Sequence, residues 1–141
     1  PEASHHLFAG AARSIKQSIE SAGLLPEQLS YVAGAGNGTA FDRLETATLR
    51  AALGPYAERV AISSILGQCG ESLTAAGLRF GAALSAFSSS TLPGTTLCRT
   101  PDPEVSLPGL LLSPSTAQVE HVLVPCLAQG GGNVSFVVSR A

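Results

Sequence analysis

The stretch that decides the fold is residues 31–39, which read Tyr-Val-Ala-Gly-Ala-Gly-Asn-Gly-Thr. Its first residues end a short apolar strand, predicted over residues 29–33, and the rest form a loop with three glycines. A helix is predicted directly afterwards, from about Asp42 to Leu53, where Gly54 and Pro55 end it. Strand, loop and helix in this order are typical of an α/β unit.

The same alternation extends outward on both sides of this stretch. An amphipathic helix is predicted before it, from Phe8 to Gly23, and a second short strand after it, from Val60 to Ser63. A helix from about Glu71 to Phe87 then carries Arg79 as its one charge after Leu73, and apolar or small residues occupy every face. We therefore expect parallel strands that are covered by helices on both faces of the sheet.

The apolar helix over residues 71–87 also bears on domain organisation. A helix that is apolar all round is a buried helix, and it needs a layer on each side. One unit of 141 residues with a single sheet can cover one face of such a helix. The sequence therefore predicts a second half, supplied by another chain or by further sequence of the same protein.

The pattern of residues changes after Phe87, and the Pro-rich stretch from Pro93 to Pro114 shows no helical period. Two apolar strands follow, predicted over residues 121–127 and 134–139, on either side of a glycine run at residues 129–133. A short glycine-rich connection between two strands predicts a hairpin-like antiparallel edge to the sheet.

The composition excludes several classes of function. The net charge is -2 and no basic stripe is present, which argues against nucleic acid as a partner. No run reaches the roughly 18 apolar residues of a membrane helix, and the N-terminal residues lack the pattern of a signal peptide. The three cysteines, Cys69, Cys98 and Cys126, are widely spaced, so we expect no disulfide framework, no metal site and a cytoplasmic location.

Three segments, in the same order, resemble those of the β-ketoacyl synthases, or condensing enzymes. Residues 31–39, followed by Asp42 and Glu45, resemble the ketosynthase segment Y-V-x-A-H-G-T-G-T…D-x-x-E. Residues 63–77 resemble S-S-x-K-x-x-x-G-H…A-A-G, and residues 130–133 are similar to the closing G-G-T-N. The resemblance runs from about Ser4 to the C-terminus. The family's N-terminal half, which carries the nucleophilic cysteine, is absent from this sequence.

The chain departs from the family pattern at its catalytic positions. The two family histidines fall on Ala35 and Glu71, the lysine falls on Leu66, and one residue is missing between Thr39 and Asp42. In the active enzymes these histidines support malonyl decarboxylation and stabilise the enolate and oxyanion, which requires a hydrogen-bond donor. Ala35 has no donor, and an ionised Glu71 repels an oxyanion.

These departures resemble the chain-length factor, the inactive partner in bacterial type II polyketide synthases. The resemblance implies an α/β fold, namely the C-terminal half of a thiolase-like layered αβαβα fold with a mixed sheet, closing in an antiparallel edge over residues 1–141. It implies an active ketosynthase subunit and an acyl carrier protein as partners, a hetero- or homodimer, and no cofactor. It assigns no catalytic residue, and the predicted tunnel or loop residues are Gly36, Asn37, Gly38, Thr39, Gln129, Gly130, Gly131 and Asn133.

Some residues have a second interpretation. The glycine loop precedes a helix, as phosphate loops do, but it lacks the GK[ST] ending and the G-x-G-x-x-G spacing. A tight turn that lines the old active site is favoured. Asp42 and Glu45 could form an acid–base pair, but carboxylates at a helix start also suit the helix dipole, and Thr39 or Asp42 could cap the first turn.

The cysteines and histidines are weak candidates for chemistry. Cys69 could be a nucleophile, but no base lies near it in the motif, so an inert buried thiol is favoured. His5 and His6 are adjacent and cannot face one metal ion together on a helix. His121 and Cys126, five apart on a predicted strand, are expected on opposite faces.

Two other functions remain open. The chain could belong to an active acyltransferase or ketosynthase whose nucleophile lies in the missing half, or it could be a stand-alone module that binds an acyl or aromatic ligand. A cysteine at the nucleophile position of the missing half would favour an enzyme. A glutamine or small residue there would favour the inactive partner, and tight acyl binding by this chain alone would favour the module.

Overall fold

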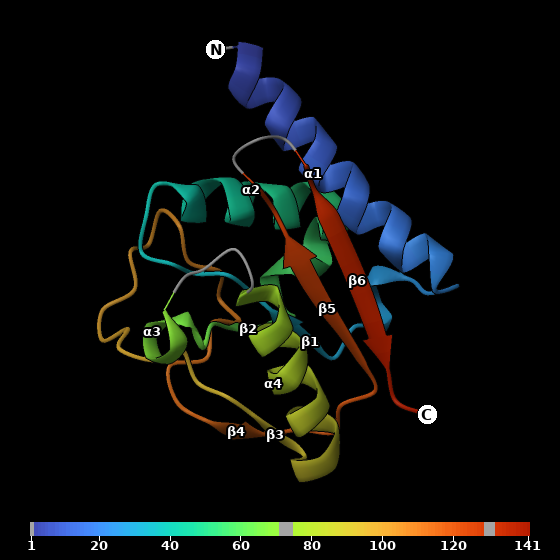
Figure 1. Ribbon diagram of the computed structural model, residues 1–141, viewed down its shortest axis with the longest axis vertical. Coiled ribbons are helices and arrows are strands. Elements are labelled where there is room, and N and C mark those ends of the chain that lie inside the picture. The colour runs from blue at the N-terminus through green and yellow to red at the C-terminus, as the bar shows by residue number, and fades with distance from the viewer. Residues whose placement is uncertain (1, 71–74, 129–131) are drawn as a thin grey trace.

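The computed structural model describes residues 2–70, 75–128 and 132–141, with the side chains of residues 2–7 and 75 excepted. Its helices are α1 (Glu2–Ser21), α2 (Phe41–Leu53), α3 (Leu66–Cys69) and α4 (Ala75–Ser89), with short 3-10 turns at Pro26–Gln28 and Gly54–Glu58. Its strands are β1 (Tyr31–Ala33), β2 (Ala61–Ser63), β3 (Thr91–Leu92), β4 (Ser115–Thr116), β5 (His121–Cys126) and β6 (Val134–Ser139). Figure 1 shows how these elements are arranged.

The main sheet is mixed and has the strand order β2-β1-β5-β6. β1 runs parallel to β2 and to β5, with Tyr31 opposite both Ala61 and Val122. β6 runs antiparallel to β5 along its whole length, from His121 opposite Ser139 to Cys126 opposite Val134. The mixed sheet and its antiparallel edge confirm the predicted fold class.

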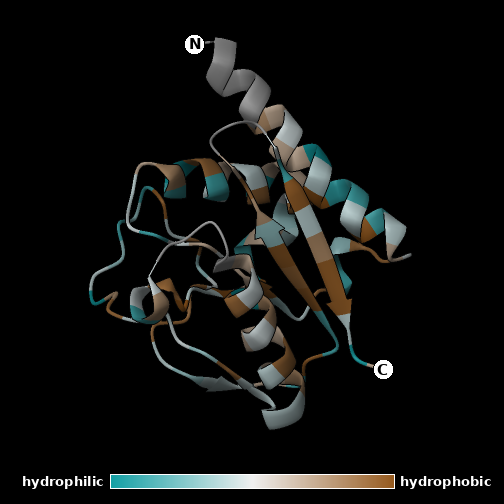
Figure 2. Ribbon diagram, viewed as in Figure 1, coloured by the Kyte–Doolittle hydropathy of each residue, from teal (hydrophilic) through white to brown (hydrophobic). Residues whose placement is uncertain are grey.

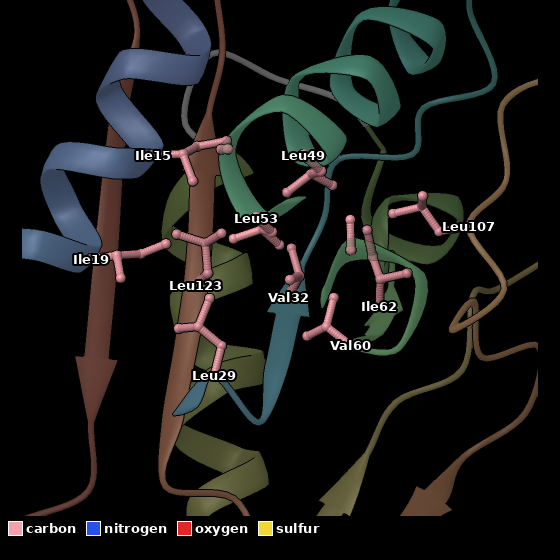
Figure 3. Close-up of a cluster of buried hydrophobic side chains, with 12 residues drawn as sticks. Ile15, Ile19, Leu29, Val32, Leu49, Leu53, Val60, Ile62, Leu107 and Leu123 are labelled. Carbon is pink, nitrogen blue, oxygen red and sulfur yellow. The ribbon is translucent and has the colours of Figure 1, made fainter. Parts of the chain in front are cut away.

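The side chains of the strands alternate between two cores, as the pleat of a sheet requires. Val32 and Leu123 face α1 and α2, where they join a cluster that includes Ile15, Leu49 and Leu53 (Figure 3). The neighbouring residues on the strands point to the other face and pack with α4; these are Tyr31, Ala33, Val122 and Val124. The sheet is thus covered by helices on both faces, as predicted.

The helix α4 is buried on one face only within this chain. Arg79, Ala83 and Ala86 face the sheet, whereas Leu78 and Leu84 are 47% and 59% exposed. Figure 2 shows apolar residues on the side of α4 that is turned away from the sheet. This chain therefore covers one face of the helix, as expected of a unit with a single sheet, and nothing in its described residues covers the outer face.

Other differences concern the ends of elements. α1 begins at Glu2, six residues before the predicted start at Phe8, and Gly23 follows its end with a φ of 70°. The single turn of α3 and the small β3–β4 pair were not predicted, because two to four residues carry no readable period. Residues 71–74 of the predicted apolar helix lie outside the described residues. Among the described helices, none is long and apolar enough to cross a membrane.

Candidate functional site

The glycine loop after β1 is held by two carboxylates of α2. The amides of Ala35 and Gly36 donate to the two oxygens of Glu45, at 2.8 and 3.1 Å. The amides of Asn37 and Gly38 donate to the two oxygens of Asp42, at 2.9 and 3.0 Å. These bonds give Asp42 and Glu45 a structural role, which the sequence analysis favoured over an acid–base pair.

The loop needs its glycines because it bends sharply and packs closely. Gly36 and Gly38 have φ values of 43° and 76°, in the left-handed region that other residues rarely adopt. A Cβ on Gly34 would lie 3.2 Å from Cδ1 of Ile62, and one on Gly36 would lie 3.0 Å from Cβ of Ser64. The loop therefore lies directly against the end of β2.

Among the described residues, the side chains of Asn37 and Thr39 form hydrogen bonds within the loop. The Asn37 side-chain oxygen accepts from the amide and the hydroxyl of Thr39, at 3.2 and 2.7 Å. The Thr39 hydroxyl in turn accepts the amide of Phe41, the first residue of α2, at 3.2 Å. Since the amides of residues 35–38 already donate to carboxylates, this geometry gives no support to a phosphate loop.

Glu45 is the buried member of the carboxylate pair, with 5% of its surface exposed. Burial raises the pKa of its carboxyl above the ordinary value, because a charged group is costly away from water. The amides of Ala35 and Gly36 and the positive charge of Arg79 act in the opposite direction, and the charge of Asp42 adds to the rise in the pKa.

The end of β2 forms the second wall of the site. Ser63 hydrogen-bonds the hydroxyl of Tyr31 at 2.7 Å, and burial raises the pKa of Tyr31 to about 12. The Ser64 hydroxyl donates to the carbonyl of Ala35 and accepts the amide of Leu66 at 3.1 Å. Ser64 thereby joins the glycine loop to the first turn of α3.

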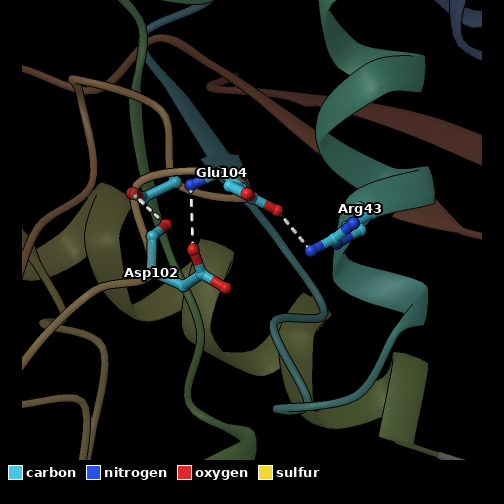
Figure 4. A network of polar contacts seen from close by, with 4 residues as sticks. Arg43, Asp102 and Glu104 are labelled. Carbon is cyan, nitrogen blue, oxygen red and sulfur yellow. Dashed lines mark hydrogen bonds and ion pairs between the residues drawn. The ribbon is translucent and has the colours of Figure 1, made fainter.

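A cavity of about 840 Å³ lies between the glycine loop, the end of β2, α3 and the segment 95–110. The ion pair between Arg43 on α2 and Glu104 links two sides of its rim, and Figure 4 shows Asp102 beside this contact. The side chains of both partners are about two-thirds exposed, so the pair adds little stability. The Thr46 hydroxyl also donates to the carbonyl of Val105, which anchors the segment to α2.

The predicted loop residues take two different places. Gly36, Asn37, Gly38 and Thr39 all line the cavity. Asn133 does not line it; its side chain accepts the amide of Ala128 at 3.3 Å and lies close to Gly10 of α1. The remaining predicted residues, Gln129, Gly130 and Gly131, lie outside the described residues.

Two of the three positions that replace family catalytic residues are described. Leu66 lines the cavity and is 4% exposed. Ala35 does not line the cavity; its amide is bound to Glu45 and its carbonyl to Ser64. Glu71 lies outside the described residues, so its interpretation as a structural anion stays a prediction.

Among the described side chains, the cysteines and His121 show no catalytic grouping. Cys69 ends the single turn of α3 and is exposed, so the expectation of a buried thiol is wrong. Cys126 is half-buried beside Arg79, and burial raises the pKa of its thiol. The His121 Nδ1 hydrogen-bonds the Ser139 hydroxyl at 2.9 Å. The described residues contain no cluster of three His, Cys, Asp or Glu side chains that could hold a metal ion. His5 and His6 lie on α1, and their side chains are outside the described part.

Sequence reasoning missed the segment 95–110 and the role of Arg79. The segment supplies Thr95, Thr96 and Val105 to the cavity wall. Its sequence shows neither helical nor strand periodicity, and apart from its prolines it gave no sign of this position. Arg79 was noted as the lone charge of an apolar helix, and its partners come from β5, which no local pattern reveals.

Comparison with known proteins identifies the relatives of this chain. The family described as “Beta-ketoacyl synthase, C-terminal domain” matches residues 3–97. A protein named polyketide beta-ketoacyl synthase 1 of Streptomyces virginiae is 36% identical over 135 residues, which cover 94% of this chain and 32% of that protein. A 3-oxoacyl-[acyl-carrier-protein] synthase 2 of Synechocystis is 31% identical over 133 residues, which are 93% of the chain and 32% of that protein. The chain thus spans about a third of the length of these relatives.

Solved structures share the fold. A structure described as the ishigamide ketosynthase/chain length factor matches with a TM-score of 0.87 at 24% identity, over 95% of this chain and 33% of that chain. A ketosynthase in complex with its chain length factor from Xenorhabdus doucetiae matches with a TM-score of 0.81 at 26% identity, over 93% of this chain and 33% of that chain.

Proposed function

The chain belongs to the β-ketoacyl synthase family through its C-terminal domain, and on that premise we propose that it is part of a non-catalytic subunit of the chain-length-factor type. Such a subunit pairs with an active ketosynthase and helps to bound the tunnel in which the acyl chain grows. The pairing and the role in polyketide or fatty-acid-type chain extension are parts of this proposal.

One observation carries the proposal: at the two described positions that replace family catalytic residues, Ala35 and Leu66, the side chains have no hydrogen-bond donor. Leu66 contributes an apolar wall to the cavity, and the side chain of Ala35, between the lining residues Gly34 and Gly36, is a methyl group. The Ala35 amide, which could otherwise serve an oxyanion, already donates to Glu45 at 2.8 Å. Decarboxylation and condensation both need positioned donors where negative charge develops, so this wall is suited to shaping a tunnel rather than to catalysis.

The outer face of α4 supports the part of the proposal that concerns assembly. Leu78 and Leu84 are exposed there, and on the same side of the sheet Phe136 of β6 is 42% exposed although it packs edge-on against Phe80 with ring centroids 5.0 Å apart. Exposed apolar residues grouped in this way favour a covering layer. The N-terminal half of the same subunit would cover α4, and an active ketosynthase and an acyl carrier protein would complete the assembly.

The alternative is an active enzyme whose nucleophile lies in sequence beyond this chain. The relatives named as synthases favour it, because they are named for an activity. The two proposals differ in whether the protein itself processes a malonyl group.

A decarboxylation assay distinguishes them. The intact protein that carries this chain, without any ketosynthase, is incubated with malonyl-loaded acyl carrier protein, and release of CO₂ is measured against carrier protein alone. We expect the background rate, because neither Ala35 nor Leu66 can stabilise the enolate. Turnover above that background would overturn the non-catalytic assignment and establish the enzyme.

A further inference from the structure

Arg79 is the one charged residue on the described length of α4, and it is 7% exposed. An arginine in that position normally reaches solvent unless it is paired. Its guanidinium instead points to the sheet, where it donates to the carbonyl of Pro125 and contacts Sγ of Cys126 at 3.7 Å. Its Nε has no hydrogen-bond partner among the described residues.

Glu45 is the buried acidic residue that could balance the buried positive charge of Arg79. The two surface ion pairs of the described residues, Arg43–Glu104 and Arg50–Glu58, involve neither of the two groups. A buried carboxylate without a compensating charge is costly. Glu45 nevertheless binds two amides with its two oxygens, which is the arrangement of an ionised carboxylate.

Glu45 lies on α2 and Arg79 on α4, in the helical layers on opposite faces of the sheet. Oε1 of Glu45 lies 3.6 Å from where a Cβ of Gly34 would stand, just past the end of β1. The parallel register of β1 and β5 pairs Val32 with Leu123, and its continuation brings Gly34 level with Pro125, which Arg79 contacts. β1 and β2 end at Ala33 and Ser63, whereas β5 continues to Cys126, so both groups lie at this end of the sheet.

We propose that Arg79 is a positioning residue: its buried charge keeps Glu45 ionised, and Glu45 in turn fixes the glycine loop in the wall of the cavity. This inference does not depend on the proposed function, because it concerns the ionisation of Glu45 and not whether the protein is catalytic. The other described groups that face Glu45 are Asp42 on α2, whose charge opposes ionisation, and the thiol of Cys126 on β5.

Protonation of Glu45 would change the hydrogen bonds that hold the glycine loop. An ionised Glu45 accepts both amides strongly, whereas protonation turns one of its oxygens into a hydroxyl, which is a weaker acceptor, so the hydrogen bond of one of the amides of Ala35 and Gly36 weakens. The positive charge of Arg79 favours the ionised form, because an opposite charge lowers the pKa of a carboxyl, here against the larger rise that burial causes. Without that charge, the loop loses its anchor at a higher pH.

Hydrogen exchange of the intact protein tests the inference, with fragmentation that resolves the amides of Ala35 and Gly36. Exchange is followed over a pH series and corrected for the intrinsic rate. In Arg79→Gln, which removes the charge but keeps a donor for Pro125, we expect the midpoint for loss of protection to rise by about one pH unit or more. Arg79→Lys keeps the wild-type midpoint, and Arg13→Gln on the exposed side of α1 serves as the control.

The same substitution made in the Glu45→Gln protein distinguishes an effect of the Arg79 charge on Glu45 from an effect of the packing of the Arg79 side chain. Glu45→Gln does not titrate, so Arg79→Gln should leave loop exchange unchanged when it is added to Glu45→Gln. An equal effect of Arg79→Gln in both backgrounds would overturn the inference, as would an Arg79→Lys midpoint as high as that of Arg79→Gln. If Arg79→Gln does not fold, the Arg79→Lys midpoint decides: the wild-type value supports the inference and an upward move overturns it.

Discussion

Asp42 and Glu45, three residues apart on α2, divide the four successive amides of residues 35–38 between them. Residues three apart share one face of a helix, so both carboxylates reach the same loop. The loop geometry therefore depends on two side chains with different surroundings, since Glu45 is buried and Asp42 is half-exposed. The predictions that follow test each of them separately.

Asp42→Ala should loosen only the second half of the loop. The amides of Asn37 and Gly38 lose their acceptor but can reach water, so we expect a loss of about 1–2 kcal/mol in the free energy of unfolding. Hydrogen exchange should accelerate at Asn37 and Gly38 and stay unchanged at Ala35 and Gly36. Glu27→Ala, at an exposed position, is the control, and accelerated exchange at all four amides would contradict separate anchoring.

Glu45 predicts a particular pH dependence of stability. Its pKa is raised on folding from the ordinary value of 4.5, so between the two pKa values the folded state binds more protons than the unfolded state. The stability of the wild type relative to Glu45→Gln should therefore fall as the pH rises through this window, and then stay level. Urea unfolding of both proteins over a pH series measures it. A relative stability that rises over the same window would mean that the pKa is lowered on folding.

Gly109→Ala should damage the edge of the sheet beside β2. A Cβ on Gly109 would stand 2.0 Å from the carbonyl oxygen of Val60, which is backbone and cannot move aside alone. We expect a loss of about 3 kcal/mol in unfolding free energy. Gly132→Ala, which meets nothing within 4 Å, is the matched control. Equal stability of the two variants in thermal unfolding would show that the close contact is not needed.

The exposed face of α4 predicts an effect on assembly. Leu84 is 59% exposed, and Leu84→Asp would place a charge in the layer that we propose covers it. The intact protein should then lose its compact assembled form in size-exclusion chromatography. Leu25→Asp, at a 65% exposed leucine outside this face, should keep it. Identical elution of the two variants would show that the outer face of α4 stays open in the assembled protein.

The features of the fold that depend on local periodicity could be predicted from the sequence. The strand before the glycine loop, the helix after it and the hairpin of β5 and β6 were all expected within a few residues. The expectation that a single sheet covers only one face of the apolar helix agrees with the exposure of Leu78 and Leu84 on α4. An all-apolar pattern indicates that a helix is covered in its assembly, and it cannot say which chain covers it.

The site could be predicted in part. The glycine loop, Asp42 and Glu45 were identified because they lie in one continuous motif. The segment 95–110 and the contact of Arg79 with Pro125 join residues that are far apart in the chain, such as positions 79 and 125. Such contacts follow from the order of the strands, and that order is not encoded in any local pattern of residues.

The most direct measurement is the intact mass of each chain in the purified complex with its ketosynthase, after incubation with malonyl- and acetyl-loaded acyl carrier protein. If the subunit is non-catalytic, the acyl adduct appears on the ketosynthase chain, and the protein that carries this chain keeps its unmodified mass. An adduct on that protein, at Cys69 or at a nucleophile elsewhere in it, would contradict the account and make it an acyl-transferring enzyme.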